Sequence, residues 1–293
     1  MTGGKIGVIG ASGWLGGHLC ECLLKRGWEV IGFSRSERAE GQMSWRVWDG
    51  EGAVDLSGLD AVVNLAGEAI DQRWTAERKV AFRKSRVDLT KALCDSIRGS
   101  EVRVLLNASA IGYYGDRGDD ELPESEPPGE GYLADLCRDW EAAVSVPDEV
   151  RVVYLRTGVV LGRGGRAWEK MKKVFGFGIG GRLGSGRQWM PWIHLDDEIG
   201  AIIHSLEKGL EGPVNLAAPG ALRNKEFTKA VGRAMGRPTL FPAPAFALKL
   251  ILGDFAEEGL LASTRVVPAV LQETGYQFVH PTIEEARADL LRK

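Results

Sequence analysis

The chain has 293 residues, of which 44% are hydrophobic and 26% charged, and its formal net charge at pH 7 is -3. This near-balance of charge argues against a nucleic-acid or anionic-membrane partner, and no apolar run approaches the roughly 18 residues of a membrane span. No signal peptide is visible, and the four cysteines form no Cys-x-x-Cys pair. We therefore expect a cytoplasmic protein with reduced thiols, and no metal site.

Predicted strands and helices alternate from residue 5 onward. Val, Ile and Leu fill the strands almost continuously, and the helices carry apolar residues at helical spacing. Strands are expected over residues 5–11, 28–35, 43–50, 59–67, 102–110 and 150–162, and helices over 14–27, 75–99 and 132–145. The 75–99 helix should be interrupted or bent. Farther on, we expect a helix within 191–209 and a strand within 213–220 that returns to the main sheet.

Near-continuous apolar strands separated by helices indicate a parallel sheet covered on both faces. The fold class expected is therefore α/β, with a Rossmann-like, doubly wound parallel sheet and a smaller, mainly helical C-terminal domain. Residues 1–162 are predicted to form the nucleotide-binding domain, to which 191–218 return. Residues 163–190 and 219–293 are predicted to form a cap that binds substrate.

Three glycines, Gly10, Gly13 and Gly16, separate the first strand from the first helix. In a dinucleotide-binding turn, the first glycine permits a tight turn and the second lets the backbone approach the pyrophosphate. The third lets helix and strand pack closely. The helix N-terminus then offers free N–H groups and a favourable dipole to the anion. Glycines also serve ordinary turns, but this position in an alternating chain favours a dinucleotide.

The end of the second strand distinguishes NAD from NADP. An NAD site usually places Asp or Glu there, which accepts a hydrogen bond from the ribose 2′-OH. This chain has Ser34 and Arg35 instead, with Arg38 close behind. A carboxylate would repel a 2′-phosphate, whereas a hydroxyl and a guanidinium would bind it. We predict NADP(H) as the cofactor, the alternative being a solvated arginine on a loop.

Several motifs resemble those of the extended short-chain dehydrogenase/reductase superfamily, and within it the divergent epimerase family of the 39U type. The motifs, spread nearly from end to end, are GASGWLG, NLAGEAI, SAIGYYGD, LRTGVVLG, GSGRQWMPWIHLDD and RNKEF. The resemblance implies an NADP-binding Rossmann domain and a small C-terminal domain that holds substrate. By position it assigns cofactor contacts to Gly10, Ser12, Gly13, Trp14, Leu15, Ser34, Arg35, Leu65, Ala66, Gly67, Glu68, Arg86 and Val160. Arg86 is equally compatible with a surface arginine, and Asp49, a candidate partner of the adenine amino group, with a simple loop aspartate.

The chain departs from the superfamily at the catalytic residues. The usual Tyr-x-x-x-Lys pair is absent, because Leu136 follows Tyr132, the tyrosine in the expected place, by four residues. Ala110 occupies the usual serine position, and Ser109 comes one residue earlier. An unperturbed tyrosine, with a pKa of about 10, is a poor base at neutral pH. The candidate catalytic residues are Tyr132, Ser109 and His194, with Tyr113 as a further candidate acid; His194 is also a candidate structural histidine.

A glycine-rich stretch over residues 176–186 is expected at the mouth of the cleft. Its Arg182 and the following Arg187 would hold an anionic group, and Trp189 or Trp192 would stack on the substrate. The alternative is a mobile, solvated loop. The residues assigned to substrate are Tyr113, Arg187 and Trp189.

Two functions remain open at this stage. The first is an NADP(H)-dependent oxidoreductase or epimerase that acts on an unidentified small molecule with a non-standard catalytic set. The second is a non-catalytic NADP(H)-binding sensor or regulatory module. A purely structural role is disfavoured because the phosphate-binding positions are intact. A small-molecule substrate is the expected partner, and a homodimer is compatible with the sequence.

Overall fold

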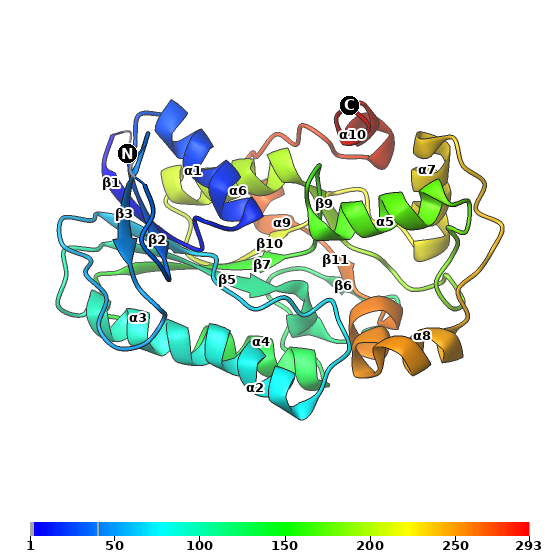
Figure 1. The fold of residues 1–293 in the computed structure, drawn as a ribbon, viewed down its shortest axis with the longest axis horizontal. Helices are drawn as coiled ribbons and strands as arrows, with labels where there is room; N and C mark the ends of the chain where they lie inside the picture. Colours follow the sequence, from blue (N-terminus) through cyan, green and yellow to red (C-terminus); the bar gives the residue numbers. More distant parts are fainter. Residues whose placement is uncertain (1–2, 40, 293) are drawn as a thin grey trace.

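A computed structural model of the chain describes residues 3–39 and 41–292 (Figure 1). Its main sheet contains the strands β1 (Lys5–Ile9), β2 (Glu29–Ser34), β3 (Ser44–Val47), β4 (Ala61–Asn64), β5 (Val104–Ala110), β7 (Arg151–Thr157) and β10 (Gly212–Leu216). They lie in the order β10–β7–β5–β4–β1–β2–β3, and every neighbouring pair is parallel. This confirms the predicted doubly wound sheet and the return of the 213–220 segment to it.

Helices cover both faces of the sheet, which explains why its central strands are mainly apolar (Figure 1). One face is covered by α1 (Trp14–Lys25) and α6 (Leu195–Glu207). The other is covered by α2 (Ala76–Arg83), the π-helical turn η1 (Lys84–Asp88), α3 (Leu89–Ile97) and α4 (Tyr132–Ala142). The π-helical turn is the interruption expected within the long 75–99 helix.

The strand order reverses between β1 and β4. From β1 the chain proceeds outward through β2 and β3, then crosses back to β4 and continues outward on the other side. The connections therefore diverge at the carboxyl ends of β1 and β4 and leave a crevice there, which is where open α/β sheets bind ligands. Residues 10–13 follow β1 and residues 65–68 follow β4, so both segments lie at this crevice.

The single strand expected over residues 150–162 is two strands in the structure. The first is β7, and the second, β8 (Val159–Leu161), leaves the main sheet and pairs with β9 (Trp192–His194). The break is at Gly158, whose N–H donates to the Leu216 carbonyl at 2.9 Å. A Cβ atom on Gly158 would lie 3.2 Å from the carbonyl oxygens of Leu216 and Pro191. Two distant segments thus meet at this glycine, which local sequence does not reveal.

The remaining elements lie outside the main sheet and its covering helices. They are η2 (Ile111–Tyr114), β6 (Glu121–Leu122), α5 (Arg166–Gly176), α7 (Asn224–Met235), α8 (Ala245–Leu252), η3 (Ala256–Leu261), β11 (Arg265–Val266), α9 (Ala269–Glu273) and α10 (Ile283–Leu290). A separate buried cluster holds α5, α7 and α10 together through Trp168, Val231 and Leu290, one from each helix. The division into a nucleotide-binding domain and a cap stays a prediction. None of the described helices is long and apolar enough to cross a membrane.

Candidate cofactor and active site

The glycine turn between β1 and α1 brings three backbone segments together. Gly10 has a φ of +85°, and a Cβ atom there would lie 3.1 Å from the carbonyl group of Leu65. The Gly13 N–H donates to the Gly10 carbonyl at 2.9 Å. A Cβ atom on Gly16 would lie only 2.2 Å from that same carbonyl oxygen. The fold itself therefore requires glycine at positions 10 and 16.

The N-terminus of α1 carries no side-chain cap. Its N-cap is Gly13, and its first turn holds no acidic residue. The N–H groups of Trp14 and Leu15 have no acceptor within the helix, because the first turn of any α-helix leaves its donors unsatisfied. Ser12 and Gly13 are exposed, so these donors face an open surface. Such unsatisfied donors, together with the helix dipole, favour an anion, and they lie where the pyrophosphate is predicted.

Trp14 connects the glycine turn to the start of α5. Its indole N–H donates to the Arg163 carbonyl at 2.8 Å. A Cβ atom on Gly165 would lie 2.6 Å from the Trp14 ring, so the indole rests directly on that backbone. The side chain of Trp14 thus forms a wall beside the predicted pyrophosphate position.

The carboxyl end of β2 carries no acidic residue. Arg35 is exposed, and it forms no ion pair with any described residue. The Ser34 hydroxyl, 7% exposed, donates its proton to the Ser36 carbonyl. Ser34 therefore has to rotate before it can donate to a 2′-phosphate, whereas Arg35 is free to bind one.

The segment after β4 is fixed by backbone and side-chain contacts. Leu65 donates to the Ile9 carbonyl at 2.9 Å, and Ala66 donates to Oδ1 of the buried Asn64 at 3.2 Å. These bonds hold 65–66 against the glycine turn, in the place predicted for cofactor contact.

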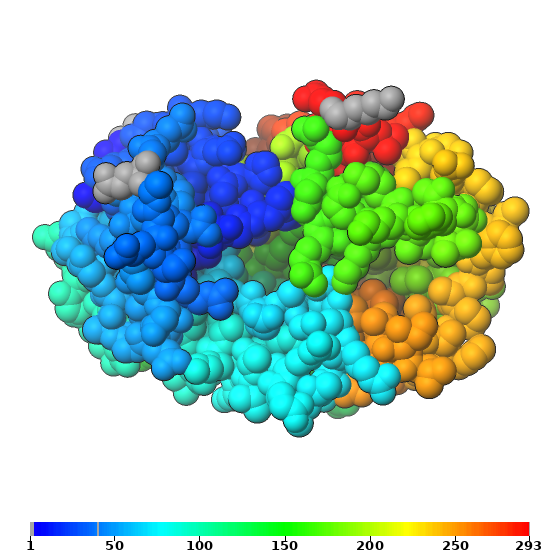
Figure 2. All heavy atoms as spheres, viewed as in Figure 1, coloured from blue at the N-terminus to red at the C-terminus, as the bar shows by residue number. Residues whose placement is uncertain are grey.

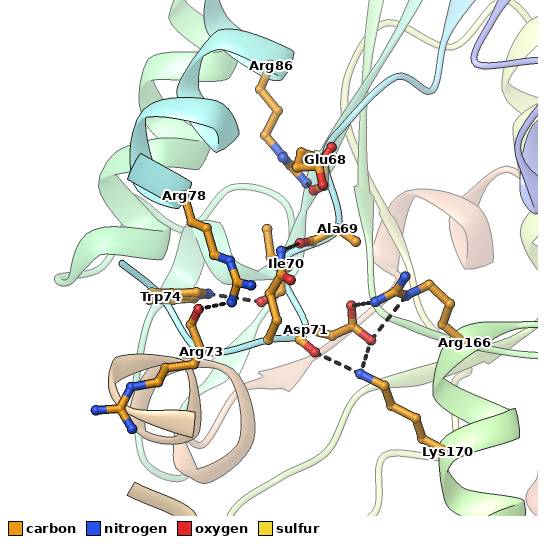
Figure 3. Close-up of polar contacts among 11 residues, drawn as sticks. Glu68, Ala69, Ile70, Asp71, Arg73, Trp74, Arg78, Arg86, Arg166 and Lys170 are labelled. Atoms are coloured by element: carbon orange, nitrogen blue, oxygen red, sulfur yellow. Dashed lines mark hydrogen bonds and ion pairs between the residues drawn. The ribbon is translucent and has the colours of Figure 1, made fainter. Parts of the chain in front are cut away.

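Arg86 holds the next two residues of this segment (Figure 3). The π-helical turn η1 presents Ser85 and Arg86 together: Ser85 Oγ accepts from the Glu68 N–H at 3.0 Å, and Arg86 Nη2 donates to the Glu68 carbonyl at 2.9 Å. A Cβ atom on Gly67 would lie 3.1 Å from the guanidinium. Burial lowers the pKa of Arg86. Arg86 is therefore a half-buried cation held against residues 67–68, rather than an arginine free on the surface, and its contact with a cofactor stays a prediction.

A buried polar network lies behind the carboxyl end of β5. Ser109 Oγ donates to Glu141 at 2.7 Å, and Arg156 binds both oxygens of that carboxylate at 2.9 Å. Arg156 also donates to the Tyr114 hydroxyl at 2.9 Å, and its Cζ lies 3.6 Å from the centre of the Tyr113 ring. Ser109 is therefore part of an internal network. The sequence interpretation missed Glu141 and Arg156, although Arg156 is a charge that follows four uncharged residues within its strand.

Tyr132 does not pair with Ser109. Its hydroxyl donates to the Lys79 carbonyl of α2 at 3.1 Å, and its ring packs edge-on against Trp74. Burial raises its pKa. Two other residues of α4, Leu133 and Cys137, face Gly112 of η2, just after β5. The geometry does not support Tyr132 as the proton donor. Its hydroxyl is directed toward α2, and the apolar Leu133 and Cys137 occupy the side of α4 that faces the end of β5.

His194 is fully buried at the N-cap of α6. Its Nδ1 accepts from the Asp196 N–H at 3.2 Å, its Nε2 lies 3.3 Å from an Asp289 oxygen, and its ring centre is 4.0 Å from that of His280. Burial lowers its pKa. One ligand atom each of His194, Asp196 and His280 lie within 4.8 Å of one another. His280 Nε2 lies 3.0 Å from Asp196 Oδ2, whereas His194 Nε2 and His280 Nδ1 make no hydrogen bond to a described residue. These contacts favour the structural reading of His194.

Two of the predicted substrate residues, Arg187 and Trp189, share the partner Arg223, whose guanidinium donates to the Arg187 carbonyl at 2.6 Å. Trp189 donates its indole N–H to Asp119 at 2.9 Å, and the Arg223 guanidinium lies 4.6 Å from its ring centre. Arg187 is exposed. The proposed stacking role of Trp192 is wrong, because Trp192 lies in β9 and is 1% exposed.

Two further predicted contacts differ in their surroundings. Val160 is half-buried in β8, opposite Ile193 of β9. Asp49 accepts from the Glu51 N–H at 2.9 Å, which favours a simple turn-forming role over adenine recognition.

Glu198 is a fully buried carboxyl group of α6 near the carboxyl end of β7. The Thr157 hydroxyl donates to its Oε1 at 2.8 Å, while Oε2 has no partner among the described residues. Burial raises the pKa of Glu198 to about 8, so this group is mainly protonated and neutral at pH 7.

Fold and glycine turn together define a nucleotide-binding α/β protein of the epimerase type. Residues 6–217 match the NAD dependent epimerase/dehydratase family, and residues 243–290 match a domain of unknown function, DUF1731. The chain therefore belongs to the NAD dependent epimerase/dehydratase family, which confirms the resemblance drawn from its motifs.

Individual relatives cover the chain almost completely. An epimerase family protein of Mycobacterium tuberculosis, MT2273, is 41% identical over 98% of this chain and 97% of its own length. The structure of human epimerase family protein SDR39U1 with NADPH has a TM-score of 0.89 at 32% identity, over 98% of both chains. A nucleoside-diphosphate sugar epimerase of Corynebacterium glutamicum has a TM-score of 0.81 at 32% identity, over 99% of this chain and 58% of that chain.

Two adjacent glycines of α1 provide a matched test of the turn. Gly16→Ala should lower the free energy of unfolding by more than about 1 kcal/mol, because the new methyl group would lie 2.2 Å from the Gly10 carbonyl oxygen. At Gly17 the nearest atom would be 3.7 Å away, so Gly17→Ala should be neutral or stabilise by up to about 1 kcal/mol. Urea unfolding of both variants measures the difference, and equal stabilities would contradict this geometry.

Glu198 predicts a pH dependence of stability. Its pKa rises on folding from the ordinary 4.5 to about 8, so between these values the folded state binds more protons than the unfolded state. Its stabilising contribution is complete below pH 4.5 and is lost as pH rises through 8. Glu198→Gln should flatten this decline and stabilise the protein by a few kcal/mol near pH ~9. Unfolding curves across this range, with exposed Glu211→Gln as control, test it; parallel profiles would refute it.

Proposed function

We propose that the chain binds NADP(H) at the carboxyl ends of β1, β2 and β4. The observation that carries the proposal is an uncapped helix N-terminus beside a strand end that bears a guanidinium and no carboxylate. Backbone N–H groups of Trp14 and Leu15 would hold the pyrophosphate, and Arg35 the 2′-phosphate. The human relative solved with NADPH supports this assignment.

We further propose that the protein is an oxidoreductase or epimerase of a small molecule. The bound dinucleotide would exchange a hydride with that molecule. Tyr113 is the candidate proton donor, because it lies in η2, the turn that follows β5, and its hydroxyl makes no hydrogen bond to a described residue. The Arg156 guanidinium, packed on the Tyr113 ring and itself bound by Glu141, would keep that phenol in place.

A non-catalytic NADP(H)-binding module is the second candidate. It is favoured by one observation: the hydroxyls of Ser109 and Tyr132 both donate to groups of the protein itself. A screen that follows NADPH absorbance with a panel of aldehydes, ketones and sugar derivatives distinguishes the two functions. Turnover of any member supports the enzyme, whereas tight cofactor binding without turnover across the panel supports the module.

We also propose a cytoplasmic location. Support comes from the four cysteines, Cys20, Cys22, Cys94 and Cys137, which are all free thiols.

The cofactor preference should depend on Arg35. NADPH should bind at least tenfold more tightly than NADH, which corresponds to about 1.4 kcal/mol. Arg35→Ala should remove most of this preference and leave NADH affinity unchanged. Arg38→Ala is the matched control, since the Arg38 guanidinium packs over the Trp45 ring at 5.1 Å. Calorimetric titrations of the three proteins with each cofactor measure all six constants, and equal affinity of the unchanged protein for both cofactors would refute the assignment.

The two tyrosines should differ in their effect on turnover. Tyr113→Phe should lower the single-turnover rate by roughly 10²–10⁴, the usual effect of a lost general acid. Tyr132→Phe should change it only a few-fold, because its hydroxyl donates to the Lys79 carbonyl. Both rates are measured at saturating cofactor once the screen has given a substrate. A thousandfold loss in Tyr132→Phe alone would reverse the assignment.

A further inference from the structure

An ion-pair cluster joins the loop after β4 to the first turns of α5 (Figure 3). Arg166 Nη2 lies 2.8 Å from Asp71 Oδ1, and Lys170 Nζ lies 2.5 Å from Asp71 Oδ2. Lys170 also donates to the Asp71 backbone carbonyl at 2.7 Å. Burial alone would raise the pKa of Asp71, but its hydrogen bonds with Lys170 and Arg166 lower it. The carboxylate therefore stays ionised and paired with two cations.

The loop that carries Asp71 is ordered by its own hydrogen bonds. Gln72 Nε2 donates to the Ala69 carbonyl at 2.7 Å, and the Trp74 indole N–H donates to the Ile70 carbonyl at 2.9 Å. Trp74 is 7% exposed and fixes the loop to the core. The hydrogen-bonded loop therefore holds Asp71 in a fixed position facing α5.

Both partners of this cluster also abut the glycine turn. On one side, the loop begins at Leu65, which contacts Gly10. On the other side, α5 begins after Gly165, on which the Trp14 ring rests. The ion pair therefore closes a ring of segments around the uncapped end of α1. Figure 2 shows a hollow at this place, bordered by the blue N-terminal segments, the cyan segment near residues 70–80 and the green α5 segment.

We propose that Asp71, Arg166 and Lys170 complete the cofactor site on its outer side, as an electrostatic clasp that retains bound NADPH. This proposal rests on the proposed function. A dinucleotide with its pyrophosphate at the N-terminus of α1 lies inside the ring, so its departure requires the clasp to open. Because Arg166 and Lys170 are more than half exposed, salt should weaken the clasp. The clasp then sets the rate of cofactor release.

The test is the dissociation rate of NADPH, followed by its fluorescence after displacement with excess NADP⁺. Asp71→Asn should accelerate release about tenfold, and the Arg166→Met/Lys170→Met variant should do the same. Combining all three substitutions should add little, because each breaks the same clasp. Added salt should accelerate release from the unchanged protein more than from Asp71→Asn.

Asp254→Asn is the matched control. Asp254 pairs with Lys79 of α2 at 2.8 Å, an exposed ion pair between segments that does not belong to the ring around α1. Its removal should leave release unchanged. Release from Asp71→Asn within twofold of the unchanged protein, or equal acceleration by Asp254→Asn, would overturn the clasp while leaving the proposed function intact. Failure of the unchanged protein to bind NADPH would overturn both. Thermal melting confirms that each variant is folded.

Discussion

The close approach of Gly16 to the carbonyl oxygen of Gly10 determines how the site is assembled. Because neither residue has a side chain, α1 begins directly against the end of β1. The first N–H groups of the helix therefore reach the crevice between β1 and β4. The same approach places Gly10 against Leu65 and lets Trp14 extend to Gly165. One backbone contact thus orders the anion site and both of the segments that border it.

Charge at this crevice is distributed unevenly. Behind β5, both oxygens of Glu141 bind Arg156. Without such a partner, the burial of the Arg156 charge would cost several kcal/mol of folding free energy. Glu198 avoids the same cost by remaining protonated at neutral pH. At the front, the N-terminus of α1 and Arg35 carry positive charge without an acidic partner among the described residues. An anionic ligand is the partner that this arrangement favours.

Local sequence patterns predicted a parallel sheet, the alternation of strands and helices along the chain, and the glycine turn. These features depend on periodicity and on residues close in the chain. They did not predict the break at Gly158, where Leu216 and Pro191 converge from far along the chain. Nor did they predict the burial of Trp192, since β9 pairs with β8 outside the main sheet.

Side-chain direction was the least predictable property of the site. Tyr132 stands at the position expected for the family, yet its hydroxyl reaches Lys79 because Leu133 and Cys137 face β5. Ser109 donates to Glu141, 32 residues away, and the charge that fixes Glu141 comes from a neighbouring strand. The orientation of α4 about its own axis and the pairing of strands across the sheet determine these contacts. A short sequence motif predicts neither.

The central claim is that the N-terminus of α1 and Arg35 bind the two anionic parts of one dinucleotide. Phosphorus NMR of NADPH titrated with the unchanged protein tests it most directly, because the pyrophosphate and the 2′-phosphate give separate signals. Both signals should shift and broaden together until the protein is saturated. Signals that keep their free positions at excess protein, or a pyrophosphate shift without any change in the 2′-phosphate, would contradict the claim.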